Sequence, residues 1–435
     1  MKAVDRVDDS VRNYIKGILA RISLGKNEFK KAVILARSAE FGVWLPNDFR
    51  LVFEALLSLM NAQPERAIAL ATEALSQSRK EGIGSIIFSA HLIMASAYCS
   101  LGDKKRAKIL IERSLHFFNK NNLIREKTIF SILHTFVAKV NSICSMTPPE
   151  KHTLPTIKLV LLIKNRKYLQ AISYAKKKYL MHYFYNYIFI TAEKIKEFVE
   201  KGKKTGLPKT ILRLPVFNKE IPVYHIKFLG NVIVYKNQKY LKTKLRPKDY
   251  AFLIYLYQKA MEPKRSIDLN EVYRNFWPNS EKASRNFSHL LLRVKKALKI
   301  PSHLLTVSRS YGESSLINEG IYFTTDYQEF EQSLARAKAL QRAGEWKFAK
   351  KEFLQAFKLF RGEPFKKNFD EWSVNMRFKI LTELETEAIN FAQACLEHGN
   401  KRDAKRVLEK VLKIIPDSEE LQKMRGEKLV LYYKS

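Results

Sequence analysis

The chain has 435 residues, 46% hydrophobic and 28% charged, enough for about two to four domains with buried cores, which argues against a disordered protein. Its 78 basic and 43 acidic side chains give a formal net charge of +35, which favours a polyanionic partner such as nucleic acid. A general lysine bias is the alternative. Cys99, Cys144 and Cys395 lie far apart, which argues against a disulfide framework or a cysteine zinc site and fits a reducing cytoplasm.

Residues 1–200 are predicted to form tetratricopeptide-like helical repeats. ERAIALATEALS, from Glu65, and KRAKILIERSLH, from Lys105, align with a period of 40 residues. Around the second stretch, small, large and turn-forming residues follow the spacing of such a helix pair: Ala95, Tyr98, Gly102, Ala107, Ile111 and Ser114. Small residues let two antiparallel helices approach, and the glycine ends the first helix. The repeats would offer a concave surface to a peptide, a protein or a small-molecule effector, or would serve only as a scaffold.

No membrane association is expected for this region. The first residues lack the apolar core of a signal peptide, and no apolar run is expected to reach the length that spans a bilayer. Residues 179–190 form the most apolar run, and we interpret them as a buried or inter-domain helix. The glycines and prolines of residues 201–221 predict a linker. GKKTG within it lacks the spacing of a phosphate-binding loop, so no nucleotide site is expected.

Residues 222–325 have a different periodicity and carry 18 basic against 7 acidic side chains. Three short strands are predicted between 223 and 244, and then a helix with Pro247 in its first turn. A second helix begins at Asp268, which could form a capping box with Glu271, and ends at Pro278. A third helix covers 280–299. A hairpin follows, with a first strand at Leu304–Val307, a tip around Arg309–Ser315 and a return strand to Thr324.

The third predicted helix has one apolar face and one basic face without an acidic residue at the i±4 spacing that would pair with it. Strands, three helices and a hairpin follow the order of a winged helix-turn-helix, whose third helix enters the major groove of DNA. A basic face that is merely solvated is the alternative. The groove-facing candidates are Arg285, Ser288, His289, Leu292, Arg293 and Lys296. Arginine can bind guanine through two hydrogen bonds, and Leu292 could contact a thymine methyl group.

Further basic residues are candidates for contacts with the DNA backbone. Lys295 and Lys299 are expected to neutralise phosphates, and Lys244, Arg246 and Lys248 could bind phosphate at the start of the first helix. Arg309 and Tyr311 at the hairpin tip could reach a minor groove or a phosphate, or form a plain exposed turn. No spacing typical of a catalytic or metal site is present, so we expect neither an enzyme nor a bound cofactor or metal.

Residues 326–435 repeat the small-large-glycine spacing of the first domain. One set is Ala337, Leu340, Gly344, Ala349, Phe353 and Ala356. The other is Ala392, Cys395, Gly399, Ala404, Leu408, Val411 and Pro416. With 22 basic and 18 acidic side chains, this segment lacks the charge excess of the preceding one, which a uniform lysine bias would not explain.

Over about half of the chain the sequence resembles the SARP-type bacterial transcription activators. ASRNFSHLLLRVKKAL is similar to the third helix of their OmpR-type winged helix, and LNEVYRNFW to its second helix. DYQEF, QAFKLFRGEPF and EWSVNMRFKILTELETEA resemble the bacterial transcriptional activator domain that follows it. The N-terminal repeats resemble, more loosely, those of MalT-like regulators. Two features depart from the family: a repeat domain precedes the winged helix, and neither an NTPase module nor a phosphoacceptor receiver is recognisable.

The resemblance implies that the segment between the second and third helices contacts RNA polymerase, through Asn275, Asn279, Ser280 and Glu281. It also implies a homodimer on directly repeated sites. We therefore expect a mostly α-helical chain in which tetratricopeptide-like repeats flank a winged helix with a small sheet and a hairpin wing. The predicted function is a cytoplasmic activator that reads double-stranded promoter DNA. The alternative is an interaction scaffold whose winged helix binds protein.

Overall fold

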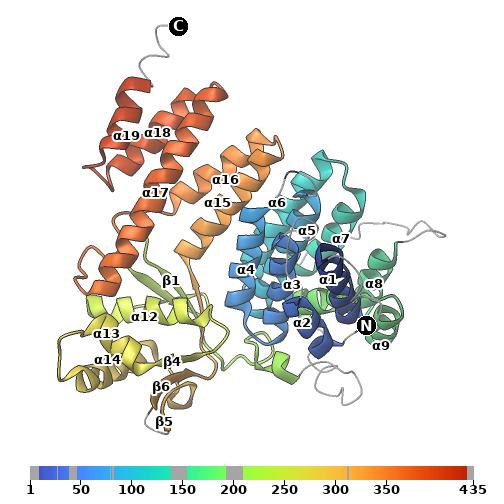
Figure 1. The fold of residues 1–435 in the computed structure, drawn as a ribbon, viewed down its shortest axis with the longest axis horizontal. Coiled ribbons are helices and arrows are strands. Elements are labelled where there is room, and N and C mark those ends of the chain that lie inside the picture. The colour runs from blue at the N-terminus through green and yellow to red at the C-terminus, as the bar shows by residue number, and fades with distance from the viewer. Residues whose placement is uncertain are drawn as a thin grey trace. The chain divides into compact units, whose positions relative to one another are not determined.

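The computed structural model describes residues 9–26, 28–38, 47–78, 80, 83–138, 154–192, 209–310 and 313–428. The chain divides into two compact units, one of residues 1–221 with 342–344, and one of residues 222–341 with 345–435. Both are rich in helices, and small sheets occur in the second unit (Figure 1). The predicted fold class, mostly α with a small β region, is therefore confirmed.

The first unit consists of consecutive helices, most of which pack with their neighbours in the chain. They are α1 (Asp9–Gly25), α2 (Phe29–Ser38), α3 (Asn47–Met60), α4 (Pro64–Gln77), α5 (Ile83–Ser100), α6 (Lys104–Lys120), α7 (Ile124–Val137), α8 (Pro155–Lys164), α9 (Tyr168–Lys177) and α10 (Met181–Ile190). The small residues singled out in α5 and α6 are buried, among them Ala95 and Ala107, each 0% exposed. Gly102 between these helices has φ +79°, the left-handed conformation that suits glycine.

Two segments of the first unit differ from expectation. Helix α5 is, by length and composition alone, apolar enough to cross a membrane, contrary to the expectation that no apolar run reaches that length, and 78% of it is buried inside the structure. The described part of the expected linker contains a short 3-10 helix, Lys209–Arg213, and buries Ile211, Leu214 and Phe217. The Thr210 hydroxyl donates to the carbonyl of Met60, so this part contacts the end of α3.

The second unit begins with a four-stranded sheet in the order β3-β2-β1-β7. Strands β1 (Val223–Lys227), β2 (Ile233–Lys236) and β3 (Lys239–Leu241) are antiparallel neighbours, and β7 (Tyr322–Thr325) pairs with β1 in parallel. The second sheet has the order β4-β6-β5 and consists of β4 (Ser266–Asp268), β6 (Glu313–Asn318) and β5 (Leu305–Ser310). The predicted return strand to Thr324 was thus wrong, because it ends at Asn318 and the chain then crosses to the other sheet.

Three helices lie between the strands: α12 (Pro247–Ala260), α13 (Leu269–Phe276) and α14 (Ala283–Leu298). Their shared core is aromatic, since Phe252 meets both Phe276 and Phe287 edge to face, at centroid distances of 6.0 and 5.7 Å. Asp268 caps α13 as predicted by accepting from the Asn270 N–H. Glu271 does not complete a capping box and instead pairs with Lys259 at 2.7 Å.

The chain ends in a second set of helices: α15 (Asp326–Arg342), α16 (Trp346–Lys358), α17 (Glu371–Glu397), α18 (Lys401–Leu412) and α19 (Glu419–Lys423). The small residues of the predicted repeats, such as Ala349 and Ala404, are 0% exposed. Gly344 and Gly399 adopt φ +76° and +67° at the turns, as the repeat spacing requires. Helices α17 and α18 run side by side (Figure 1).

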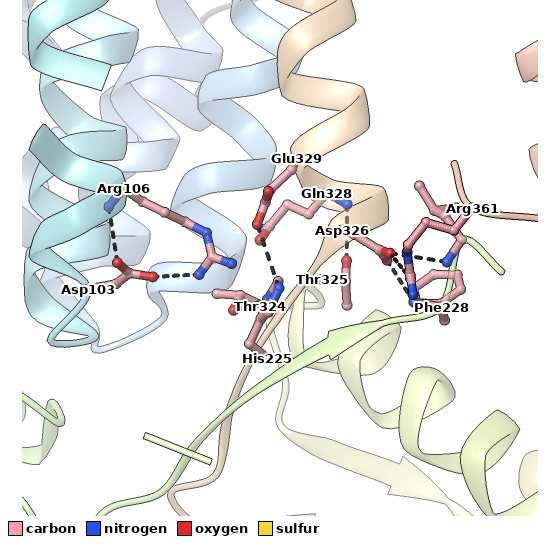
Figure 2. A network of polar contacts seen from close by, with 11 residues as sticks. Asp103, Arg106, His225, Phe228, Thr324, Thr325, Asp326, Gln328, Glu329 and Arg361 are labelled. Atoms are coloured by element: carbon pink, nitrogen blue, oxygen red, sulfur yellow. Dashed lines mark hydrogen bonds and ion pairs between the residues drawn. The ribbon is translucent and has the colours of Figure 1, made fainter. Parts of the chain in front are cut away.

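Asp326 joins these helices to the first sheet (Figure 2). Its carboxylate accepts from the N–H groups of Phe228 and Leu229, just beyond β1, and from the Arg361 guanidinium at 2.8 Å. Burial raises the pKa of Asp326 to about 6, although the Phe228 N–H and Arg361 oppose that shift. Arg361 also donates its backbone N–H to the Leu229 carbonyl. The sheet and the C-terminal helices are therefore fastened together by buried hydrogen bonds.

Candidate nucleic-acid interface

Helix α14 is held by one apolar side and by its C-terminus. Ala283, Phe287, Leu290, Leu291, Val294 and Leu298 are all buried. The carbonyl of Leu298 accepts from the Tyr224 hydroxyl at 2.8 Å, and the Lys236 ammonium reaches the carbonyls of Leu298 and Lys299. A cation at this end also complements the helix dipole. Burial, followed by the charge of Lys299, lowers the pKa of Lys236. The helix therefore has a fixed orientation relative to the sheet.

The opposite side of α14 is open to solvent. We call it the exposed face, and its members are Ser284, Arg285, Ser288, His289, Leu292, Lys296 and Lys299. Ser288 donates to the carbonyl of Ser284, four residues earlier. In the described parts of the chain no carboxylate forms an ion pair with Arg285 or Lys296. Five of the six predicted groove-facing residues therefore share this one surface.

Arg293 is the sixth candidate, and it has a protein partner. Its Nε and Nη2 atoms donate to the two carboxylate oxygens of Asp249 on α12, at 3.0 and 2.6 Å. Asp249 is 0% exposed, and its Oδ2 also accepts from the N–H of Arg246 at the start of α12. No acid lies at the i±4 spacing within α14, and the carboxylate that pairs with Arg293 comes from another helix.

Two of the expected phosphate ligands also bind the protein itself. The Lys295 ammonium donates to the carbonyls of Ser302 and Leu305, after the end of α14. Lys248 donates to the carbonyl of Phe276 and lies over the Trp277 ring, 5.2 Å from its centroid. Both ammonium groups thereby hold neighbouring segments in place. Lys244 and Arg246, by contrast, are exposed beside the N-terminus of α12.

The hairpin and the loop before α14 contain the remaining candidates. Arg309 is exposed near the end of β5, opposite Ser314 of β6, while Tyr311 lies outside the described residues. Asn275 is half-buried in the last turn of α13. Asn279 and Glu281 are exposed between α13 and α14, and Ser280 hydrogen-bonds to the side chain of Asn286. The loop candidates therefore flank the start of the exposed face.

Some residues that hold this surface in place give no signal in the sequence. Asp249 was hidden because its spacing from Arg293, 44 residues, follows no local pattern. Trp372 lies edge-on against Tyr255 of α12 and near Phe276 of α13, with centroid distances of 5.6 and 5.7 Å. Its indole N–H donates to Gln258. The base of the three-helix layer is thus supported by the first turn of α17.

Comparison with known proteins adds a domain assignment for the C-terminal helices. A search of the curated proteins found no match to this chain. Residues 325–426 match the family model of the bacterial transcriptional activator domain, in agreement with the resemblance found for residues 326–435. This domain is one of transcription regulators and not an enzyme family, in keeping with the predicted non-enzymatic role.

Proposed function

We propose that the chain is a sequence-specific DNA-binding regulator that activates transcription, and that the exposed face of α14 enters the major groove. The observation that carries the proposal is the set of exposed, unshielded side chains around Arg285 and Lys296 on a helix anchored at its opposite side. Helices in the major groove read base edges through such side chains. The match to a transcriptional activator domain in the same unit supports the proposal.

The arrangement around α14 supports an OmpR-type winged helix. In this proposal α13 and α14 form the helix-turn-helix, and the hairpin of β5 and β6 forms the wing. Arg309 would contact a minor groove or phosphate from the wing. Lys244, Arg246 and Lys299 would bind phosphates and set the position of the protein on the duplex. Arg293, Lys295 and Lys248 would act instead by positioning the elements that they bind.

The same proposal includes RNA polymerase, a second protomer and an effector as partners. The loop with Asn279, Ser280 and Glu281 would contact RNA polymerase, with Asn275 at its edge. Two protomers would bind directly repeated sites in the cytoplasm, and an effector would bind the N-terminal repeats. The competing function is a scaffold whose α14 face binds an acidic protein. An exposed leucine amid basic residues would suit either partner, so binding to DNA must decide between them.

The test compares the full-length chain with a double variant, Arg285→Ala and Lys296→Ala, on the duplex upstream of its own gene and on a shuffled duplex. Both changes are at exposed helical positions, where alanine is well tolerated. We expect the wild type to prefer the upstream duplex and the variant to lose that preference while its thermal unfolding is unchanged. The log of the binding constant should fall with log salt, by about 0.9 per phosphate neutralised. Equal affinity of both proteins for both duplexes would contradict the proposal.

A further inference from the structure

The exposed face of α14 contains one apolar side chain in a conspicuous position. Leu292 is 66% exposed, whereas every other leucine of this helix is buried. Single exposed leucines are common on protein surfaces, so exposure alone assigns no role. The position of Leu292 on the helix, however, indicates a role. At about 100° per residue, four polar residues lie within about 40° of it around the helix axis: Arg285, Ser288, Lys296 and Lys299. The leucine therefore occupies the middle of the exposed face.

The polar neighbours of Leu292 indicate which part of the DNA its side chain can contact. Ser288 and Lys296 are one turn before and after it, and His289 lies three residues before it. All of these can hydrogen-bond to base edges or phosphates, whereas the isobutyl group of leucine cannot. If α14 enters the major groove, Leu292 lies at the centre of the contact and loses its water. Opposite a polar base edge it would leave donors or acceptors unpaired, which is costly.

The major groove offers one apolar feature, the C5-methyl group of thymine. We propose that Leu292 is a specificity-determining residue that contacts this methyl group and so requires a thymine at one position of each half-site. The proposal rests on the proposed function and deepens it, because it names part of the recognised sequence. Arg285, Ser288, His289 and Lys296 would supply the hydrogen bonds on either side of this contact.

The contact can be tested by removing the methyl group from the DNA. The full-length chain first selects duplexes from a random pool, and each thymine of the selected site is then replaced singly by deoxyuridine. This change deletes only the C5-methyl group and keeps every hydrogen-bonding group. At one position per half-site the wild type should lose about three- to tenfold in affinity, the range expected for one buried methyl contact.

The protein variant Leu292→Ala closes the thermodynamic cycle. It should bind the thymine duplex about three- to tenfold more weakly than the wild type does, and should not distinguish thymine from deoxyuridine at that position. Leu169→Ala is the matched control, since Leu169 is 71% exposed on α9 of the other unit, and it should behave as the wild type does. Thermal unfolding of both variants checks that the fold is retained.

The outcomes distinguish a failure of the role of Leu292 from a failure of the proposed DNA-binding function. Tolerance of deoxyuridine by the wild type at every position would overturn the role of Leu292 and leave DNA recognition intact. An equal deoxyuridine penalty in wild type and Leu292→Ala would assign the methyl contact to another residue and would also overturn it. If the wild type enriches no sequence from the pool, the proposed function itself fails, and the role of Leu292 fails with it.

Discussion

Asp249 on α12 and Arg293 on α14 form an ion pair through two hydrogen bonds, although 44 residues separate them in the sequence. Oδ2 of Asp249 accepts from the Arg293 side chain and also from the backbone N–H of Arg246. One buried carboxylate therefore fixes the start of α12 and the orientation of α14 together. The exposed face of α14 and the basic residues before α12 are thus parts of one rigid surface.

Replacing Asp249 with asparagine should destabilise the protein, because the variant leaves a charged guanidinium without its carboxylate. We expect a loss of about 1–3 kcal/mol in the free energy of unfolding, measured with denaturant. Affinity should fall more for the specific duplex than for the shuffled one, since α14, the helix proposed to read base edges, loses its alignment. Asp268→Asn, at the exposed cap of α13, is the control and should change stability by less. If Arg293→Ala instead relaxed the preference at one base pair without loss of stability, Arg293 would be a base reader.

Asp326 should make stability depend on pH in an unusual direction. Burial raises its pKa to about 6 in the fold from an ordinary value of about 3.8, so the unfolded chain releases this proton first as the pH rises. Stability from this group is therefore greatest below pH 4 and decreases up to about pH 6. The maximal loss is about 3 kcal/mol. Unfolding of wild type and Asp326→Asn between pH 4 and 7 should show a more negative slope for the wild type. Parallel curves would refute the assignment.

Gly230 should not tolerate a side chain. It has φ +122°, and an added Cβ would lie 2.9 Å from the backbone nitrogen of Gly362. The added methyl group would collide with backbone atoms, which cannot move aside as a side chain can, in the segment whose Arg361 also binds Asp326. Gly230→Ala should therefore lower the melting temperature by several degrees, which corresponds to a loss of roughly 1–3 kcal/mol in the free energy of unfolding at the transition. Gly320→Ala is the matched control, since its Cβ would meet only the Leu304 side chain at an ordinary 3.5 Å. Equal melting temperatures for the two variants would contradict the close approach.

Trp372 should couple the C-terminal helices to the three-helix layer. Trp372→Ala removes the ring contacts with Tyr255 and Phe276 and should cost about 2–4 kcal/mol, less than the loss of a fully buried tryptophan. Trp372→Phe keeps an aromatic ring and loses the hydrogen bond to Gln258, so it should cost less. Amide hydrogen exchange should increase in α12 and α13 of the alanine variant. Unchanged exchange there would show that the tryptophan supports α17 alone.

Local pattern predicted much of this fold, because the relevant forces act between residues close in sequence. The buried set of α14, the three strands after residue 222 and the turns at Gly102, Gly344 and Gly399 follow from periodicity and from glycine's access to positive φ. Residues Tyr322–Thr325 were misplaced in the hairpin because strand partners are chosen across the fold. Their pairing with β1, about 99 residues away, leaves no local trace.

In the candidate site, too, contacts between residues far apart in the sequence could not be predicted. Periodicity identified the exposed face of α14, since a helix has a fixed angular repeat. It could not tell Arg285 from Arg293, because the two differ only in whether an acid from another helix reaches them. The sequence likewise could not show that Lys295 and Lys248 bind protein carbonyl groups, because these become available only at the ends of folded elements.

The most direct measurement of the central claim is dimethyl sulfate protection of a duplex selected by the full-length chain. The reagent methylates guanine N7, which lies in the major groove. If the exposed face of α14 occupies that groove, the wild type should protect guanines in each half-site, and the Arg285→Ala, Lys296→Ala variant should leave them reactive. Bound wild-type protein that protects no guanine N7, or a variant with the same protection pattern, would contradict the account.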